Sequence, residues 1–227
     1  MAARQMSLTL LVDKERNRVI YAESGKDFVE ILLSFLTLPL GTVIKLSGKQ
    51  SNMGSLTRLY KSLEDLDLEF LNTKACKDML LHPKSSAEEL YKYLPLIVNI
   101  GATYRTKYYI CSLNCCIGTF RLVSTVKDAP CLCGKKMGWR VPEEKGDVNA
   151  DGGDGVFIEG NLRFMITDDL HISVVSSTNS FALLSELGIS DTSVLEEMNV
   201  NVGEEEAMSL LKASLISSSV LSSVFYS

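Results

Sequence analysis

The chain has 227 residues, of which 46% are hydrophobic, so it can bury the core of one large domain or of two small ones. Its formal net charge of −5 argues against a protein that coats nucleic acid in bulk. Residues 1–11 lack the basic and apolar regions of a signal peptide, so we expect a cytoplasmic or nuclear protein. The longest apolar stretch, 28–44, is interrupted by Glu30, Pro39 and Gly41, so we expect no membrane span.

The first region, residues 1–100, has the predicted element order strand, strand, helix, strand, helix. Apolar runs predict strands at 8–12 and 19–22, with the polar turn 13–17 between them. Ser24 is expected to cap a helix, and the run 42–46 is expected to form a third strand. Asn52 would cap a second helix. The apolar faces of the two helices carry Phe28, Ile31, Leu32, Phe35 and Leu36, and then Met53, Leu56, Leu59, Tyr60 and Leu63.

The middle of the chain contains a short predicted helix, a cysteine-rich insert and a linker. Residues 86–89, Ser-Ala-Glu-Glu, match a capping box that opens a helix. The insert spans 101–142. Residues 143–158 are acidic, rich in glycine and without periodicity, so they are interpreted as a flexible linker.

Five of the six cysteines lie in the insert, and they predict one structural zinc ion. The expected ligands are Cys111, Cys115, Cys131 and Cys133, with Cys116 as the alternative to Cys115. Strand-like runs at 108–110 and 120–123 alternate with the two thiol pairs, which is the order of a zinc ribbon. Two short loops that each supply two thiolates can complete a tetrahedral site at little cost in loop closure.

The cysteine spacings leave two alternatives open. Paired ligands of a ribbon usually have two residues between them, whereas Cys111 is followed by three or four and Cys131 by one. The thiols could instead be small buried hydrophobic groups, or one disulfide with spare thiols.

The insert is also locally basic and aromatic. This composition is typical of surfaces that bind single-stranded nucleic acid, although a solvated face over a miniature core explains it as well. The residues that would contact nucleic acid are Arg105, Lys107, Lys135, Lys136 and Trp139.

The second region, residues 159–227, repeats the order strand, strand, helix, strand, helix. Strands are predicted at 162–166, 171–175 and 199–202, with helices that begin at Ser177 and near Glu204. The serine-rich end, 214–227, is expected to form a docked terminal helix. The sequence therefore predicts an α+β protein in which two pseudo-repeated β-β-α-β-α halves flank a zinc-ribbon-like insert.

Local catalytic motifs are missing from the sequence. It contains no P-loop and no nucleophile elbow. The two histidines, His82 and His171, could act with Cys76 in a thiol enzyme only if folding brought them together. Asp168-Asp169 is explained by a hairpin turn. Residues 147–152 begin like a calcium loop, but the required acid comes one residue late.

Several motifs together resemble a plant-specific family catalogued as domain of unknown function 674. The resemblance covers nearly the whole chain, implies a plant source and a cysteine-bearing middle segment, and implies no activity. The motifs that carry it are Leu11–Lys14, Val19–Glu23, Gly25–Val29, Leu36–Val43, Asn52–Leu56, Leu59–Ser62, Thr167–Leu170 and Leu210–Leu215.

From the sequence we expect a non-catalytic binding protein with one structural zinc ion and a protein partner. Two alternatives stay open: binding of single-stranded nucleic acid by the insert, and an enzyme with a cleft between the two halves. The sequence leaves the oligomeric state open.

Overall fold

The computed structural model describes residues 6–48, 53–71, 74–85, 87, 94, 107–111, 122–142 and 156–226. The chain forms two compact units that interleave along the sequence. The sheet unit comprises Met1–Leu36, Tyr93–Asn99 and Gly152–Ser227, and the cysteine unit comprises Thr37–Lys92 and Ile100–Asp151.

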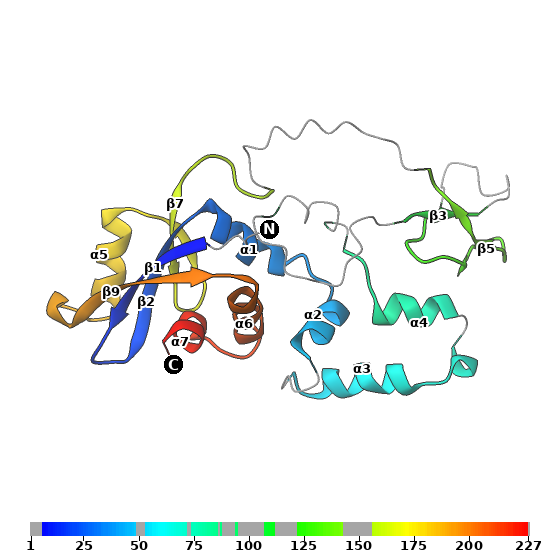
Figure 1. Ribbon diagram of the computed structural model, residues 1–227, viewed down its shortest axis with the longest axis horizontal. Coiled ribbons are helices and arrows are strands. Elements are labelled where there is room, and N and C mark those ends of the chain that lie inside the picture. The colour runs from blue at the N-terminus through cyan, green and yellow to red at the C-terminus, as the bar shows by residue number, and fades with distance from the viewer. Residues whose placement is uncertain are drawn as a thin grey trace. The chain divides into compact units, whose positions relative to one another are not determined.

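The sheet unit is built on one five-stranded antiparallel sheet with the strand order β8-β7-β2-β1-β9 (Figure 1). Strands from both ends of the chain therefore belong to the same sheet. The strands are β1 (Met6–Asp13), β2 (Arg18–Gly25), β7 (Arg163–Thr167), β8 (Ile172–Val174) and β9 (Leu195–Val202).

A buried aspartate shapes the hairpin between β1 and β2. Asp13 accepts hydrogen bonds at Oδ1 from the backbone N–H groups of Glu15 (3.0 Å) and Arg16 (2.9 Å). Asn17 then adopts a positive φ of 53°, which asparagine tolerates better than most residues. The polar turn predicted at 13–17 is confirmed.

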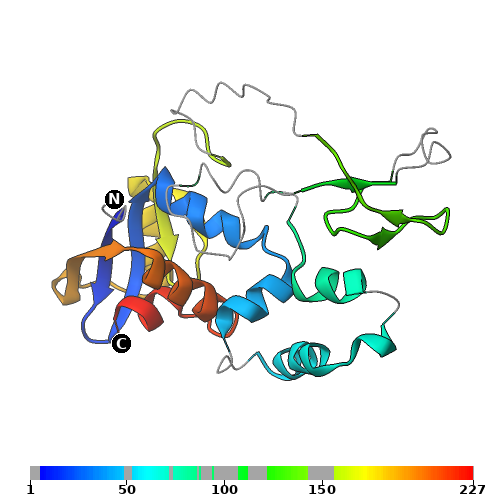
Figure 2. The same ribbon diagram turned by 45° about the vertical axis from the view of Figure 1, so that its right-hand side comes forward.

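One face of the sheet is apolar and is covered by helices α1 (Lys26–Phe35), α6 (Glu204–Ser214) and α7 (Val220–Phe225), as Figure 2 shows. Strand residues alternate between the two faces, so the buried residues Leu8 and Leu10 of β1 and Ala22 of β2, which is paired with Leu10, lie on the same side. Helix α5 (Ser177–Glu186) packs on the other face, where Ser180 contacts Met165. The core is formed by Leu8, Leu10, Ala22, Phe28, Ile31, Ile166, Leu210, Leu211 and Leu221.

The cysteine unit contains helices and two short antiparallel ribbons. The helices are α2 (Leu40–Ser47), α3 (Ser55–Asp65), the 3₁₀ helix η1 (Leu68–Phe70) and α4 (Lys74–Leu81). The ribbons pair β3 (Tyr109–Ile110) with β6 (Trp139–Arg140), and β4 (Ala129–Pro130) with β5 (Lys136–Met137). Tyr60 on α3 donates a hydrogen bond to the Leu81 carbonyl at the end of α4 (2.8 Å).

The predicted third strand at 42–46 is wrong, because these residues lie within α2. Pro39 immediately precedes the helix in an extended conformation (φ −62°, ψ 142°), and its missing N–H costs nothing at a helix start. Thr42, Val43 and Ile44 are buried, so packing outweighs the strand preference of β-branched residues. The alignment of the two halves therefore fails here, since this helix stands where the second half has β9.

Ser24 does not cap α1. The N-cap residue is Gly25, and the Ser24 hydroxyl donates instead to the Gly25 carbonyl (3.0 Å). Helix α3 exists as predicted but begins at Ser55 after Gly54, and none of its side chains is buried. Asn52 and most of the predicted helix at 86–89 lie outside the described residues, as do residues 143–155 of the predicted linker.

The secondary structure of the second region follows the prediction closely. Strands β7 and β8, helix α5, strand β9 and helix α6 occur in that order, and β9 is longer than the predicted strand at 199–202. The terminal helix is α7, in which Val220 and Leu221 are buried. No single described helix is long and apolar enough to cross a membrane. Judged by length and composition alone, the bent pair of α1 and α2 would be long and apolar enough.

Candidate metal centre

Short strands and tight turns place three cysteines. Cys111 directly follows β3, and Cys131 directly follows β4. The turn between β4 and β5 is closed by hydrogen bonds from the Cys131 N–H to the Lys135 carbonyl (2.7 Å) and from the Gly134 N–H to the Cys131 carbonyl (2.9 Å). Gly134 has a φ of 81°, a conformation that glycine adopts without strain, and this bends the chain so that Cys133 lies on the same turn.

Backbone pairing brings β3 to this turn. In the ribbon, Tyr109 lies opposite Arg140 and Ile110 lies opposite Trp139. Tyr109 also exchanges two hydrogen bonds with Ser124, of 2.8 and 2.9 Å. The predicted strand at 120–123 is not found within the described residues, because Leu122 and Val123 are not in a strand and 120–121 lie outside them. The bridge to Tyr109 is formed one residue later, at Ser124.

The sulfur atoms of Cys111, Cys131 and Cys133 all lie within 4.8 Å of one another, and those of Cys111 and Cys133 are 3.6 Å apart. Thiolates at about 2.3 Å from a tetrahedral metal ion are separated by about 3.8 Å, so the observed distances suit ligands of one ion. Soft thiolates favour zinc among the common divalent ions that take no part in redox chemistry. The three cysteines could therefore hold a metal ion.

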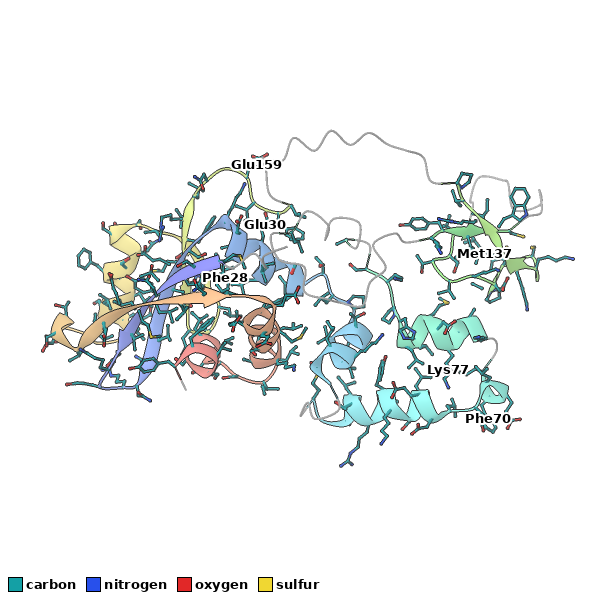
Figure 3. All side chains as sticks on the ribbon, in the orientation of Figure 1. Phe28, Glu30, Phe70, Lys77, Met137 and Glu159 are labelled. Atoms are coloured by element: carbon teal, nitrogen blue, oxygen red, sulfur yellow. The ribbon has the colours of Figure 1, made fainter. Side chains whose placement is uncertain are left out.

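A small apolar cluster supports the three thiols. Cys111 and Cys131 are buried, whereas Cys133 is exposed. Figure 3 labels Met137, which is buried in the cluster. The other members are Ala75 of α4, Ala129, and the partly buried side chains of Tyr109 and Val126. A core of this size contributes little burial energy, so cross-linking by a metal ion would contribute much of the stability of this part of the chain.

The fourth predicted ligand is Cys115 or its alternative Cys116, and both lie outside the described residues. Cys76, on α4, is described and is not part of the group of three. The structure thus brings together three of the four expected cysteines.

The ribbon of β3 and β6 has one face toward the cysteine cluster and one toward solvent. Tyr109 packs on the cluster. Tyr108, Ile110 and Trp139 share the opposite face, since Ile110 and Trp139 are directly paired and Tyr108 is two residues from Ile110. The exposed fraction of Trp139 is 67%, and that of Tyr108 is 42%.

The same part of the chain is basic. The described segments 107–111 and 122–142 contain five basic residues and one acid, Asp128. Of the residues expected to contact nucleic acid, Lys107, Lys135 and Lys136 are exposed, and Arg105 lies outside the described residues. The basic residues are Lys107, Lys127, Lys135, Lys136 and Arg140.

The other candidates from the sequence are not members of the group of three cysteines. His82 follows α4, and His171 follows the β7–β8 turn. Asp168 and Asp169 form that turn, as predicted. The Thr167 hydroxyl and the His171 N–H bind the Asp169 carboxylate, and mainly the Thr167 bond lowers the pKa of this acid below its usual value. The calcium-like sequence at 147–152 lies outside the described residues.

One buried acid, Glu30, has a role that its sequence position does not predict. It is 1% exposed on α1, and its carboxylate accepts hydrogen bonds from the backbone N–H groups of Phe157 (2.9 and 3.1 Å) and Ile158 (2.8 Å). Figure 3 labels Glu30 beside the chain that leads into β7. An acid inside an otherwise apolar helix face is the signal that could have revealed it.

Comparison with known proteins agrees with the resemblance seen in the sequence. No curated protein and no solved structure matches the chain. A family model described as "Protein of unknown function (DUF674)" matches residues 2–227, and the chain belongs to this family.

Proposed function

We propose that this protein is a non-catalytic binding protein whose cysteine unit is held together by one structural zinc ion. The observation that supports the proposal most directly is the group of three sulfur atoms within 4.8 Å of one another. Cys115 or Cys116 would supply the fourth thiolate. A closed set of four thiolates leaves no position for a substrate, so the ion would stabilise the fold rather than perform chemistry.

Metal analysis of the purified chain tests the zinc site. We expect one zinc ion per chain, and we expect its loss in a Cys131→Ser, Cys133→Ser double variant. Cys76→Ser is the matched control, because Cys76 is the described cysteine outside the group. Separate Cys115→Ser and Cys116→Ser variants identify the fourth ligand. Full zinc content in the double variant would contradict the site.

The solvent face of the β3–β6 ribbon is the proposed binding surface. Aromatic side chains are enriched at interfaces, where a partner covers the surface that Trp139 and Tyr108 expose here. Tyr108, Ile110 and Trp139 form the apolar centre of this face. A protein partner with an acidic rim would complement the surrounding lysines.

Single-stranded nucleic acid is the second candidate for the same face. Two exposed aromatic residues, Tyr108 and Trp139, lie among basic side chains, and bases stack on aromatic rings while lysines bind phosphates. The described segments 107–111 and 122–142 are basic, whereas the whole chain has a net charge of −5.

One cross-linking experiment distinguishes the two partners. A photoreactive amino acid replaces Trp139 in cells, and the matched control replaces Phe181 on α5, which has a similar exposed fraction of 73% against 67%. A protein adduct of discrete mass from position 139 alone supports the first proposal, and a nuclease-sensitive adduct supports the second. Equal adducts from both positions, or none from position 139, would contradict both. Loss of the position-139 adduct in the Cys131→Ser, Cys133→Ser variant would show that the binding surface depends on the proposed zinc site.

A further inference from the structure

A cavity of about 400 Å³ lies in the sheet unit, distant in sequence from the cysteines and independent of the proposed function. It forms where the start of β2, the β7–β8 turn, the C-terminal end of α5 and the segment before α7 meet. A cavity of this volume is in the range of small-molecule sites. Charged and hydroxyl-bearing side chains line it together with apolar ones.

Arg18 is the permanently charged base among the described lining residues. The side chain is half-buried, and its Nε atom is buried without a hydrogen-bond partner. Arg18 also forms no ion pair within the part of the chain that the structure describes. Buried polar groups are nearly always paired, so the Arg18 side chain has a hydrogen-bonding capacity that the described protein groups leave unused and that a bound molecule could satisfy.

The acids that line the cavity limit what this partner can be. Both Asp168 oxygens bind Ser222, through its N–H (2.7 Å) and its hydroxyl (2.9 Å). Asp169 is held by Thr167 and His171 and stays ionised. Glu186 is exposed at the same cavity. Three negative charges would repel a phosphate dianion, whereas a monoanion that also carries hydrogen-bond donors satisfies both Arg18 and the acids.

We propose that this cavity binds a small molecule with one carboxylate and at least one ammonium or hydroxyl group, the chemistry shared by amino acids and sugar acids. The carboxylate would bind the Arg18 guanidinium, which matches it in shape and charge. The donor groups would bind Asp169, Glu186 and the exposed hydroxyl groups of Ser218 and Ser219, which also line the cavity.

Nuclear magnetic resonance of the arginine Nε–Hε groups in the full chain tests the proposal directly. The probes are L-glutamine, gluconate, glucose and glucose 6-phosphate, each titrated to millimolar concentration. We expect the Arg18 signal to shift and saturate with glutamine or gluconate and to stay unchanged with glucose and glucose 6-phosphate. Whichever of the two carboxylates binds more tightly identifies the class of ligand.

Variants separate binding from a structural effect. In the variants, which lack the Arg18 signal, the backbone N–H signals of Asp169 and His171 at the cavity report binding. Their saturable shift with the carboxylate should disappear in Arg18→Gln, and Arg18→Lys, which keeps the charge, should retain a weaker one. Arg163→Gln is the matched control, because Arg163 starts β7 and is exposed outside the cavity. If neither carboxylate shifts the Arg18 signal of the unchanged chain, or if glucose 6-phosphate binds most tightly, the proposal is wrong.

Discussion

At the scale of single residues, the carboxylate of Glu30 connects α1 to the segment that leads into β7. Its two oxygens accept three hydrogen bonds from the backbone N–H groups of Phe157 and Ile158. The side chain is almost completely buried, so these groups cannot exchange their partner for water. A single side chain thus fixes where the chain returns to the sheet unit.

Replacement of Glu30 by alanine should therefore destabilise the sheet unit. The change leaves two backbone N–H groups without their charged acceptor, and hydrogen bonds to charged groups contribute about 1.5 to 3 kcal/mol to stability. We expect a loss of about 2 to 3 kcal/mol in urea unfolding, with faster amide exchange at Phe157 and Ile158.

The control for this variant is Glu159→Ala, because Glu159 is an exposed acid in the same segment. It should unfold like the unchanged chain, since surface substitutions away from special features have small effects. Equal destabilisation by the two variants would show that the Glu30 hydrogen bonds contribute nothing particular.

The residues of the metal centre were easier to predict than Glu30. Thiols on two turns are a local pattern, and the structure brings Cys111 close to Cys131 and Cys133. The partners of Glu30 lie more than 120 positions away in sequence, and no local rule connects an acid on a helix with the N–H groups of a distant loop. In the sequence this acid is visible only as an interruption of an apolar stretch.

At the scale of elements, the terminal helix α7 is held by the turn between β7 and β8. The Asp168 carbonyl accepts hydrogen bonds from the N–H groups of Val220 (2.8 Å) and Leu221 (3.3 Å), and the Asp168 carboxylate binds Ser222. The Ser222 hydroxyl in turn accepts from the Val19 N–H of β2 (2.8 Å). One serine thus links the last helix, a turn and the middle of the sheet.

Ser222→Ala should loosen α7 from the sheet. The change leaves the Val19 N–H and one Asp168 oxygen without their partner, and we expect a loss of about 1 to 3 kcal/mol in urea unfolding. Proteolysis should also cleave the terminal segment earlier. Ser223→Ala is the matched control, because the neighbouring Ser223 is exposed and its hydroxyl binds only the Ser219 carbonyl within the helix. A larger effect of the Ser223 variant would contradict the role of Ser222.

Helix α2 shows why some elements could not be predicted. The run 42–46 contains Thr42, Val43 and Ile44, which favour strands when judged by propensity alone. In the structure Gly41 packs closely on Pro83 and on the Leu80 carbonyl, and the Thr42 hydroxyl binds the Pro83 carbonyl (3.3 Å). These contacts, some 40 residues away in sequence, favour the helix over the intrinsic preference. The Asp168–Asp169 turn, in contrast, was predicted because its signal is local.

At the scale of the whole molecule, the topology of the sheet combines predictable and unpredictable pairings. The hairpins β1–β2 and β7–β8 join strands that are neighbours in sequence, and both were expected. The pairings of β2 with β7 and of β1 with β9 join strands far apart in sequence and merge the two predicted halves into one sheet. A period-2 pattern predicts a strand but does not specify its partner.

Removal of the proposed zinc ion should affect the stability of the two compact units differently. The sheet unit has an extensive apolar core, whereas the buried cluster around the cysteines consists of Ala75, Cys111, Ala129, Cys131 and Met137. A cluster this small contains little apolar surface to bury, so its stability should depend on the zinc ion that we propose it binds.

Hydrogen exchange before and after chelation of zinc tests this expectation. Without the ion, the backbone N–H groups of Tyr109, Ser124 and Cys131, which bind carbonyls around the thiols, should exchange much faster. The N–H groups of β1 and β2 should keep their protection, because their partners lie in the sheet. Cys76→Ser should behave like the unchanged chain in both states. Unchanged protection at Cys131 after complete removal of zinc would show that apolar packing alone holds the turn, and simultaneous loss of protection in β1 would show that the two units unfold together.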